Sequence, residues 1–374
     1  MKNKKNTLWG FLFLAFVIVC ALFLSWQGRQ FLFGLFQNDR TAYFQGVLIF
    51  LICIWGSYLL YIPVHEAGHL VGGLLTGYRF CSFRIFHWML VLVDGKLRLR
   101  RHSLPGSGGQ CLMIPPALSR GTMPVMLYNL GGSALNLMVA LLSLLLWWTL
   151  PHISPWQLLF LCSGFFHLIG ALANGLPLPI GQIPNDGCNA LHMLHKPQAV
   201  RAFWIQLQIH AMSVEGVRLK DMPEGWFYLP TNADLHNVLF AAIAVNHCNR
   251  LLDQLELKEA DAQMAILLRR QELMPIYHNA LQAERLFCEL VGANRPEVID
   301  RLYTPQLKTF LHKSRNNLSA QRIQYALALL HENDPNKAAG FLSRFHTIIK
   351  RAPHLGDVHT EQSLLALIPD SPTP

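Results

Sequence analysis

Long apolar runs alternate with short polar links over the first half of this chain. Each run reaches, or comes close to, the roughly 20 residues that a helix needs to cross a bilayer. The four runs cover residues 8–26, 43–77, 123–150 and 155–180. From about residue 197 the chain becomes polar, with apolar residues at helical spacing. The pattern therefore predicts about four transmembrane helices followed by a soluble helical part.

The link between the second and third runs has a different pattern. Residues 83–101, FRIFHWMLVLVDGKLRLRR, place two stretches of strand-forming residues around Asp94-Gly95. Asp-Gly between such stretches is typical of a two-residue hairpin turn. Residues 105–116 add a glycine-rich loop and another short strand. We therefore expect a small β insert at about residues 80–116, at the membrane surface.

Two segments of the polar half share one plan. Residues 238–268 and 323–345 each predict a pair of helices, and the second pair turns at Asn333-Asp334-Pro335. Two such copies favour an array of tetratricopeptide type, although an array normally needs at least three repeats to bury a core. The last six residues, PDSPTP, predict a disordered tail.

These patterns predict an all-α polytopic membrane protein with a small β insert and a soluble α-helical domain that resembles tetratricopeptide arrays. We expect three parts. Residues 1–42 form an uncleaved signal-anchor span and a short external loop. Residues 43–196 form a membrane core that carries the insert. Residues 197–374 form a cytoplasmic helical domain with the disordered tail.

Charged residues are few and unevenly distributed along the chain, and their positions predict the orientation of the protein in the membrane. Charged residues are 14% of the chain, against about 25% in typical soluble domains. The net charge of +9 belongs entirely to the apolar half, which holds thirteen Lys and Arg against four acids. Seven of these basic residues lie between the second and third runs, so the positive-inside rule predicts a multi-pass protein of the cell membrane with both termini cytoplasmic. Because the basic residues flank apolar runs, nucleic-acid binding is not expected.

Three ionisable side chains interrupt the second apolar run. His65-Glu66-Ala67-Gly68-His69 has the His-Glu-x-x-His spacing of zinc proteases. On a helix, residues i and i+4 share a face, so both imidazoles can reach one metal ion. Glu66 then stands beside them, placed to accept a proton from water. The alternative is a polar cluster that stabilises helix packing, but ionisable groups are costly in lipid and need a reason to be there.

A zinc site of this kind needs a third protein ligand. After the motif, the apolar half contains only two acids, Asp94 and Asp186. Asp94 is explained by its hairpin turn. Asp186 follows the fourth run, and its carboxylate can complete a zinc shell. Asn185-Asp186-Gly187 can also be read as a simple turn.

Taken together, these motifs resemble the site-2 protease family of intramembrane zinc metalloproteases. The resemblance covers about residues 43–193. It rests on three stretches, namely His65 to His69, Gly132 with Asn136 in GGSALN, and Asn174 to Pro177 followed by Asp186-Gly187. The gap from Asn174 to Asp186 is a few residues longer than the commonest family spelling, and Asn185 stands where the family usually has Leu.

The resemblance implies a role for each of these residues. His65, His69 and Asp186 would bind Zn²⁺, and Glu66 would be the general base. Asn136 would bind the substrate backbone or the developing oxyanion, although it can also be a helix-packing amide. Asn174 would hold the substrate or brace its loop.

The leading hypothesis is therefore an intramembrane zinc metalloendopeptidase that cuts a membrane-embedded protein or peptide, for regulation or for signal-peptide or pheromone processing. The β insert would accept the unwound substrate as an added strand, and the C-terminal helices would bind a regulator. A non-proteolytic membrane scaffold of the same fold is the alternative, although Glu66 beside two His has no evident use there. A metal transporter would carry polar ligands across several spans, whereas the acids here gather at one membrane depth.

Overall fold

The structure is a computed structural model that describes residues 2–35, 40–102, 107–151, 154–178, 184–229, 233–270 and 272–369. The chain divides into two compact units. The bundle unit comprises Met1–Phe86 and Gly106–Val200, and the C-terminal unit comprises His87–Pro105 and Arg201–Pro374. Part of the predicted external loop, 36–39, and nearly all of the predicted disordered tail, 370–374, lie outside the described residues.

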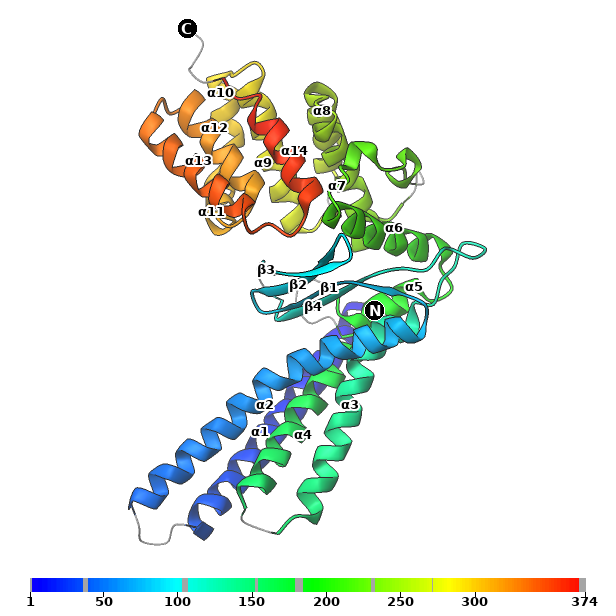
Figure 1. The fold of residues 1–374 in the computed structure, drawn as a ribbon, viewed down its shortest axis with the longest axis vertical. Coiled ribbons are helices and arrows are strands. Elements are labelled where there is room, and N and C mark those ends of the chain that lie inside the picture. Colours follow the sequence, from blue (N-terminus) through cyan, green and yellow to red (C-terminus); the bar gives the residue numbers. More distant parts are fainter. Residues whose placement is uncertain are drawn as a thin grey trace. The chain divides into compact units, whose positions relative to one another are not determined.

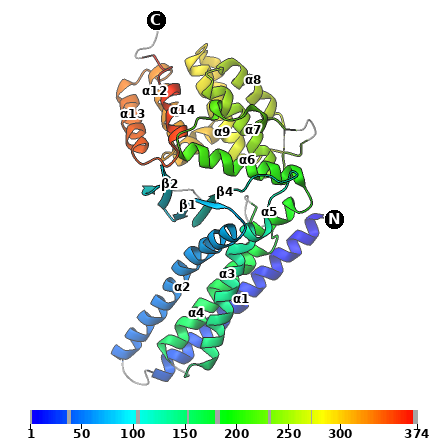
Figure 2. The ribbon, with the colours of Figure 1, turned by 45° about the vertical axis from the view of Figure 1, so that its right-hand side comes forward.

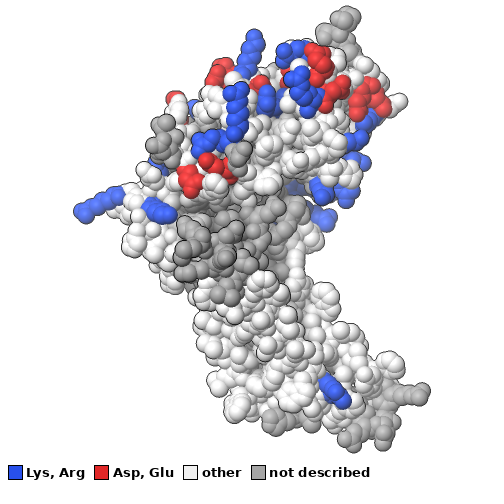
Figure 3. Space-filling view, turned by 180° about the vertical axis from the view of Figure 1, so that it is seen from behind, with Lys and Arg blue, Asp and Glu red and all other residues white. Residues whose placement is uncertain are grey.

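Four long helices run side by side in the bundle unit (Figures 1 and 2). Their bounds are α1 Lys2–Leu35, α2 Arg40–Leu75, α3 Met126–Thr149 and α4 Pro155–Gly175. By length and composition, four helices in the described part of the chain can cross a membrane, which confirms the expectation of about four apolar spans. Among the side chains that Figure 3 describes on this face of the bundle, almost none is charged.

Two of the helix ends differ from the sequence prediction. The first apolar helix continues past Trp26, so its apolar span is Trp9–Gly34. Arg29 lies within this extension, with its guanidinium 5.3 Å from the centre of the Phe33 ring. The fourth helix ends at Gly175, because Leu176 precedes a proline and adopts an extended backbone, φ −80° and ψ 140°.

Helices α2, α3 and α4 pack closely and enclose a polar interior. Where α2 meets α3, a Cβ on Gly68 would overlap the carbonyl group of Gly131. Small residues at such a crossing allow the backbones of apolar helices to approach each other. The buried polar side chains of the three helices are Ser57, His65, Glu66, His69, Asn129, Ser133, Asn136, Ser143 and His167.

The β insert consists of two antiparallel strand pairs. In the bundle unit, β1 (Arg79–Ile85) pairs with β4 (Gly109–Ile114). In the C-terminal unit, β2 (Trp88–Val93) pairs with β3 (Lys96–Arg101) through a tight turn. Asp94 and Gly95 in that turn have φ of 50° and 70°, as a type I′ hairpin requires. The predicted hairpin and the small antiparallel β insert are thus confirmed.

Short helices make up most of the C-terminal unit. Their bounds are α6 Pro197–Val214, α7 Val238–Asp253, α8 Leu257–Leu268, α9 Pro275–Val291, α10 Pro296–Leu302, α11 Pro305–Lys313, α12 Leu318–Leu330, α13 Pro335–Ile349 and α14 Leu355–Leu365. Several begin with proline, whose missing N–H costs nothing in the first turn. The two predicted helix pairs are present as α7 with α8 and α12 with α13. Asn333, with φ of 52°, makes the second turn, and Asp334 caps α13 by accepting from the Lys337 amide at 2.9 Å.

A buried arginine joins three helices of this unit. Arg322 of α12 is fully buried, and its Nη2 lies 2.8 Å from Glu284 Oε2 of α9. Its Nε lies 2.7 Å from Glu361 Oε2 of α14, and its guanidinium lies 4.0 Å from the centre of the Phe287 ring. Two carboxylates and one ring therefore compensate the desolvation of one cation.

Removing this cation should destabilise the C-terminal unit. We expect Arg322→Ala to lower its free energy of unfolding by about 3–5 kcal/mol, because two carboxylates stay buried without their partner. Hydrogen exchange in detergent should show lost protection across α9, α12 and α14. Arg344→Ala, at an exposed position of α13, is the matched control and should leave protection unchanged. Equal exchange in both variants would contradict the structural role of Arg322.

Candidate metal centre

The first two candidate ligands lie on one face of α2. His65 and His69 are one helical turn apart, and their rings meet edge to face with 4.7 Å between centroids. Their Nε2 atoms are 3.1 Å apart. Both side chains are buried among α2, α3 and α4. The i, i+4 spacing therefore places two imidazole nitrogens at one point.

The third candidate, Asp186, is the first residue of the short helix α5 (Asp186–Met193). Its Oδ2 lies 3.0 Å from His65 Nε2 and 3.4 Å from His69 Nε2. Burial would raise the pKa of Asp186, but hydrogen bonds with both imidazoles hold it at about 2. The structure thus places an ionised carboxylate against the two rings, and the three residues could hold a metal ion.

Asn185 explains how Asp186 is held in position. The Asn185 side chain caps α5 by accepting from the Cys188 amide at 2.9 Å. Its NH₂ group donates to the carbonyl oxygens of Ala173 and Leu176, each at 2.6 Å. Asn185 therefore ties the start of α5 to the end of α4, although it differs from the Leu expected at this position from the resemblance.

Each imidazole has a partner on its other nitrogen. His69 Nδ1 lies 2.8 Å from the carbonyl oxygen of Tyr128 and donates a hydrogen bond to it. A bound metal ion would replace the hydrogen that Nε2 shares with Asp186, which makes Nε2 the ligand atom. His65 Nδ1 lies 3.3 Å from the amide group of Asn136. Such partners fix the tautomer and the orientation of metal-binding histidines.

Asn136 and His167 form a relay behind His65. Asn136 is fully buried, and its side-chain oxygen lies 2.9 Å from His167 Nδ1 of α4. Ligation through His65 Nε2 requires a proton on His65 Nδ1. If the Asn136 amide is turned by half a rotation, its oxygen accepts a hydrogen bond from His65 Nδ1–H and its NH₂ group donates to His167 Nδ1, because the two ends of an amide are nearly isosteric. The relay therefore suits a metal-binding tautomer of His65.

The remaining predicted residues lie near this centre in different settings. Glu66 is 7% exposed and lies on α2 between the two histidines in sequence. Asn174 lies in the last turn of α4, where its side chain donates to the carbonyl oxygen of Gly170 at 3.1 Å. The structure thus brings Asn136 against a candidate ligand, whereas the Asn174 side chain bonds to a carbonyl oxygen of its own helix.

The strand β4 covers Glu66. A Cβ built on Gly109, the first residue of β4, would lie 2.5 Å from Glu66 Oε1. Arg84 of β1 is 1% exposed and holds this segment by donating to the carbonyl oxygens of Phe86, Ser107 and Gly109, at 2.6, 3.2 and 3.1 Å. Burial lowers the pKa of the Arg84 guanidinium, whereas the charge of Glu66 raises it.

Sequence reasoning missed the parts played by Arg84 and His167. Arg84 counts only as one basic residue among seven in its segment, and His167 reads as a single packed histidine in an apolar run. The available signal was that both Asn136 and His167 are polar residues inside predicted spans. Nothing in the sequence pairs one with the other.

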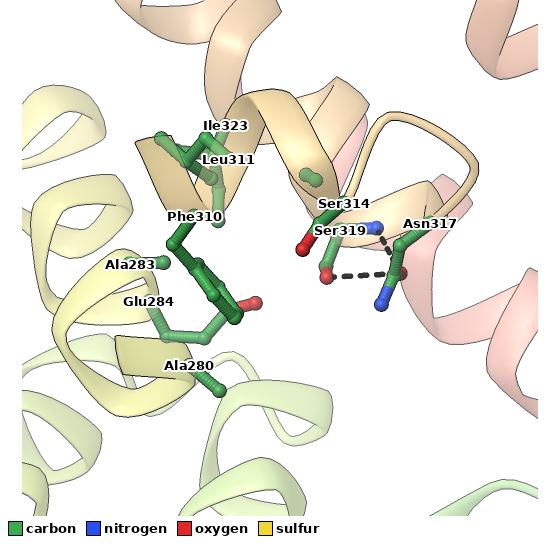
Figure 4. A pocket seen from close by; sticks show the side chains of 10 residues that line it. Ala280, Ala283, Glu284, Phe310, Leu311, Ser314, Asn317, Ser319 and Ile323 are labelled. Atoms are coloured by element: carbon green, nitrogen blue, oxygen red, sulfur yellow. Dashed lines mark hydrogen bonds between the residues drawn. The ribbon is translucent and has the colours of Figure 1, made fainter. Parts of the chain in front are cut away.

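Two other features of the C-terminal unit are weaker candidates. Asp234, His236 and Glu272 could hold a metal ion, but the first two are exposed and Glu272 is paired with Arg270 at 2.7 Å. A small pocket lies among α9, α11 and α12 (Figure 4). Its only acid, Glu284, is already bound to Arg322.

Comparison of the chain with protein-family models, with curated proteins and with solved structures gives no match.

The relay behind His65 leads to a first test at this site. His167→Ala removes the partner of Asn136 and should weaken Zn²⁺ binding by roughly 10-fold, the lower end of the cost of losing a direct partner of a metal ligand. His167→Gln, which keeps a donor and an acceptor, should restore part of the affinity. The measurement is chelator competition on detergent-purified protein. His195→Ala, at an exposed position, is the control, and affinities equal to it would rule out the relay.

Gly132 allows a second test, because α3 passes the two imidazoles at this residue. A Cβ there would lie 2.7 Å from His69 Nε2 and 2.8 Å from His65 Nδ1. Gly132→Ala should therefore displace the rings and lower Zn²⁺ affinity by at least ~10-fold, with an overpacking cost of about 1–3 kcal/mol.

Gly56→Ala is the matched control for this substitution. It adds the same methyl group to α2 at a position with no atom within 4 Å. If Gly132→Ala bound Zn²⁺ as tightly as the wild type, the contact between α3 and the two imidazole rings would be looser than the structure shows.

Proposed function

We propose that this chain is an intramembrane zinc metalloendopeptidase of the site-2 protease type. It would hydrolyse a peptide bond in or near a transmembrane segment of a membrane-anchored protein or peptide. One observation carries the proposal. The ligand atoms of His65, His69 and Asp186 converge, with Glu66 on the same helix, inside a bundle of apolar helices.

The donor set and its spacing fit zinc. Two imidazole nitrogens and one carboxylate oxygen are ligands that zinc takes in catalytic sites, with a fourth position left open. Tetrahedral zinc with bonds of 2.0–2.1 Å implies ligand atoms about 3.3 Å apart. The three separations here are 3.0, 3.1 and 3.4 Å. The site therefore needs only small adjustments to bind this ion.

Glu66 is the residue proposed to move protons. Bound zinc would supply a Lewis acid that polarises the scissile carbonyl and brings the pKa of water toward neutrality. Glu66 would take the proton from the attacking water and pass it to the leaving amine nitrogen. The buried guanidinium of Arg84 supports this role, since it is a positive charge near enough to attract the Glu66 carboxylate.

The strand β4 supports a mode of substrate binding. A transmembrane helix pairs its own amides, so it must unwind before a peptide bond can be attacked. β4 pairs with β1 on one side and is an edge strand among the described residues. An unwound substrate segment added to β4 would lie beside Glu66, because Gly109 of β4 touches that carboxylate. In this proposal Asn136 positions His65, and Asn174 braces the end of α4.

The C-terminal unit is proposed to bind a regulator or a substrate tail. The helix pairs α7 with α8 and α12 with α13 support a likeness to tetratricopeptide arrays, whose stacked helices form extended binding surfaces. The excess of Lys and Arg between the second and third spans supports a cell-membrane protein with both termini in the cytoplasm.

The proposal predicts a separation of turnover from metal binding. Glu66→Gln should lower turnover by about 10²- to 10⁴-fold, because the general base is lost. Zn²⁺ content should stay as in the wild type, since Glu66 is not one of the three ligands. We would express both forms in membranes and compare new peptide N-termini by mass spectrometry. Cleavage sites inside or next to transmembrane segments should appear with the wild type alone.

Asp94→Asn, at the exposed hairpin turn, is the control and should keep the wild-type cleavage pattern. If Glu66→Gln and the wild type gave identical peptide termini, the protease proposal would be wrong. A cellular phenotype rescued equally by both forms would then identify a scaffold.

A further inference from the structure

Three histidines from distant parts of the sequence meet in the C-terminal unit. His102 directly follows β3, His210 lies near the end of α6, and His354 is the residue before α14. We call these three residues the histidine cluster. His354 Nε2 lies 3.1 Å from His210 Nδ1, and their ring centroids are 4.8 Å apart. The ring of His102 stands edge-on to that of His354, with 5.7 Å between centroids.

The spacing of the central pair matches that of the candidate metal centre. There, the two imidazole nitrogens are also 3.1 Å apart. The histidine cluster is half-buried, however, whereas His65 and His69 are buried. In the histidine cluster, burial is the main cause that lowers the pKa of both His210 and His354. Both imidazoles are therefore neutral at pH 7, which is the form that binds metal ions.

A carboxylate stands behind one ring of the cluster. His354 Nδ1, on the side away from His210, lies 3.8 Å from Asp357 Oδ2. Asp357 is itself oriented, because the Ser213 hydroxyl donates to its Oδ1 at 2.6 Å. The separation of His354 Nδ1 from Asp357 Oδ2 is longer than a hydrogen bond, so Asp357 acts on the ring through its charge. A carboxylate near a metal-binding imidazole raises the basicity of that imidazole.

We propose that His102, His210 and His354 form a second metal site, separate from the candidate catalytic centre, that binds a divalent transition-metal ion such as Zn²⁺. Three imidazoles suit Zn²⁺, Ni²⁺ and Cu²⁺, and they do not suit Mg²⁺ or Ca²⁺, which prefer oxygen. His210 and His354 are already at ligand spacing, and His102 completes the set by turning its side chain toward them.

An ion at this site would tie the β2–β3 hairpin to the helices of the C-terminal unit. His102 ends the hairpin, and Arg100 of β3 already donates to the carbonyl oxygen of Lys350 at 3.4 Å. In the chain, the hairpin lies between β1 and β4, and β4 begins at the residue that touches Glu66.

The test counts metal ions in the full-length protein, purified in detergent without a polyhistidine tag. The wild type should bind two Zn²⁺ per chain. His354→Gln should lose one of them, with an affinity for the second ion lower by on the order of 100-fold. Asp357→Asn keeps all three ligands and should weaken the same site by roughly 10-fold. Asp186→Ala should lose the other ion and keep this one.

His359→Gln is the matched control, at an exposed position of the same helix α14, and should retain both ions. The same Zn²⁺ count and affinity in His354→Gln and His359→Gln would overturn the second site. Loss of every ion in Asp186→Ala would overturn it as well. Neither result depends on Glu66, so the second site and the proposed protease can fail separately.

A second readout covers the case in which His354→Gln does not fold. Addition of Zn²⁺ to the Asp186→Ala protein should slow hydrogen exchange in residues 88–101, because the ion fixes His102. Unchanged exchange at saturating Zn²⁺ would refute the tie between the hairpin and the helices.

Discussion

Burial of two imidazoles and a carboxylate inside one apolar helix is the constraint on which the rest of the bundle depends. An unpaired polar group in such an interior costs several kcal/mol. His65 and His69 avoid this cost because each has a partner at both ring nitrogens. These partners are the Tyr128 carbonyl and the Asn136 amide, both of α3, and the Asp186 carboxylate of α5. The bundle therefore has to bring together segments that lie more than 100 residues apart.

The position of Asp186 follows from this constraint. Glu66 is the only acid of α2, so a carboxylate ligand beside the two imidazoles has to come from another segment. Asn185 satisfies this need by capping α5 and tying its first residue to the end of α4. The turn reading and the ligand reading of Asn185-Asp186-Gly187 are thus compatible, since the capping turn is what aims the carboxylate.

Local patterns were enough to predict the elements and the first two candidate ligands. Apolar run length predicts the four long helices, and Asp94-Gly95 predicts the hairpin because both residues must adopt positive φ. His65 and His69 follow from i, i+4 spacing alone. Partners that meet only through tertiary packing are a different matter. Asn136 with His167, and His210 with His354, are 31 and 144 residues apart, and no local rule links them. The end of α1 was missed for a different reason. The sequence pattern places Arg29 past the end of the apolar run, but one arginine near an apolar end can remain within a helix.

The cover over Glu66 connects the packing of the β insert with the proposed chemistry. Arg84 is a buried cation whose guanidinium bonds to backbone carbonyls of the segment that ends at Gly109. This arrangement holds β4 against the carboxylate, and Glu66 as a whole residue is 7% exposed. In the proposed reaction, the backbone that shields Glu66 is also the backbone with which a substrate strand would pair. Substrate binding and access of water to the base are then linked by geometry, because a strand that joins β4 occupies the space beside the carboxylate. In this proposal, the segment that is hydrolysed is one that has adopted an extended conformation and paired with β4.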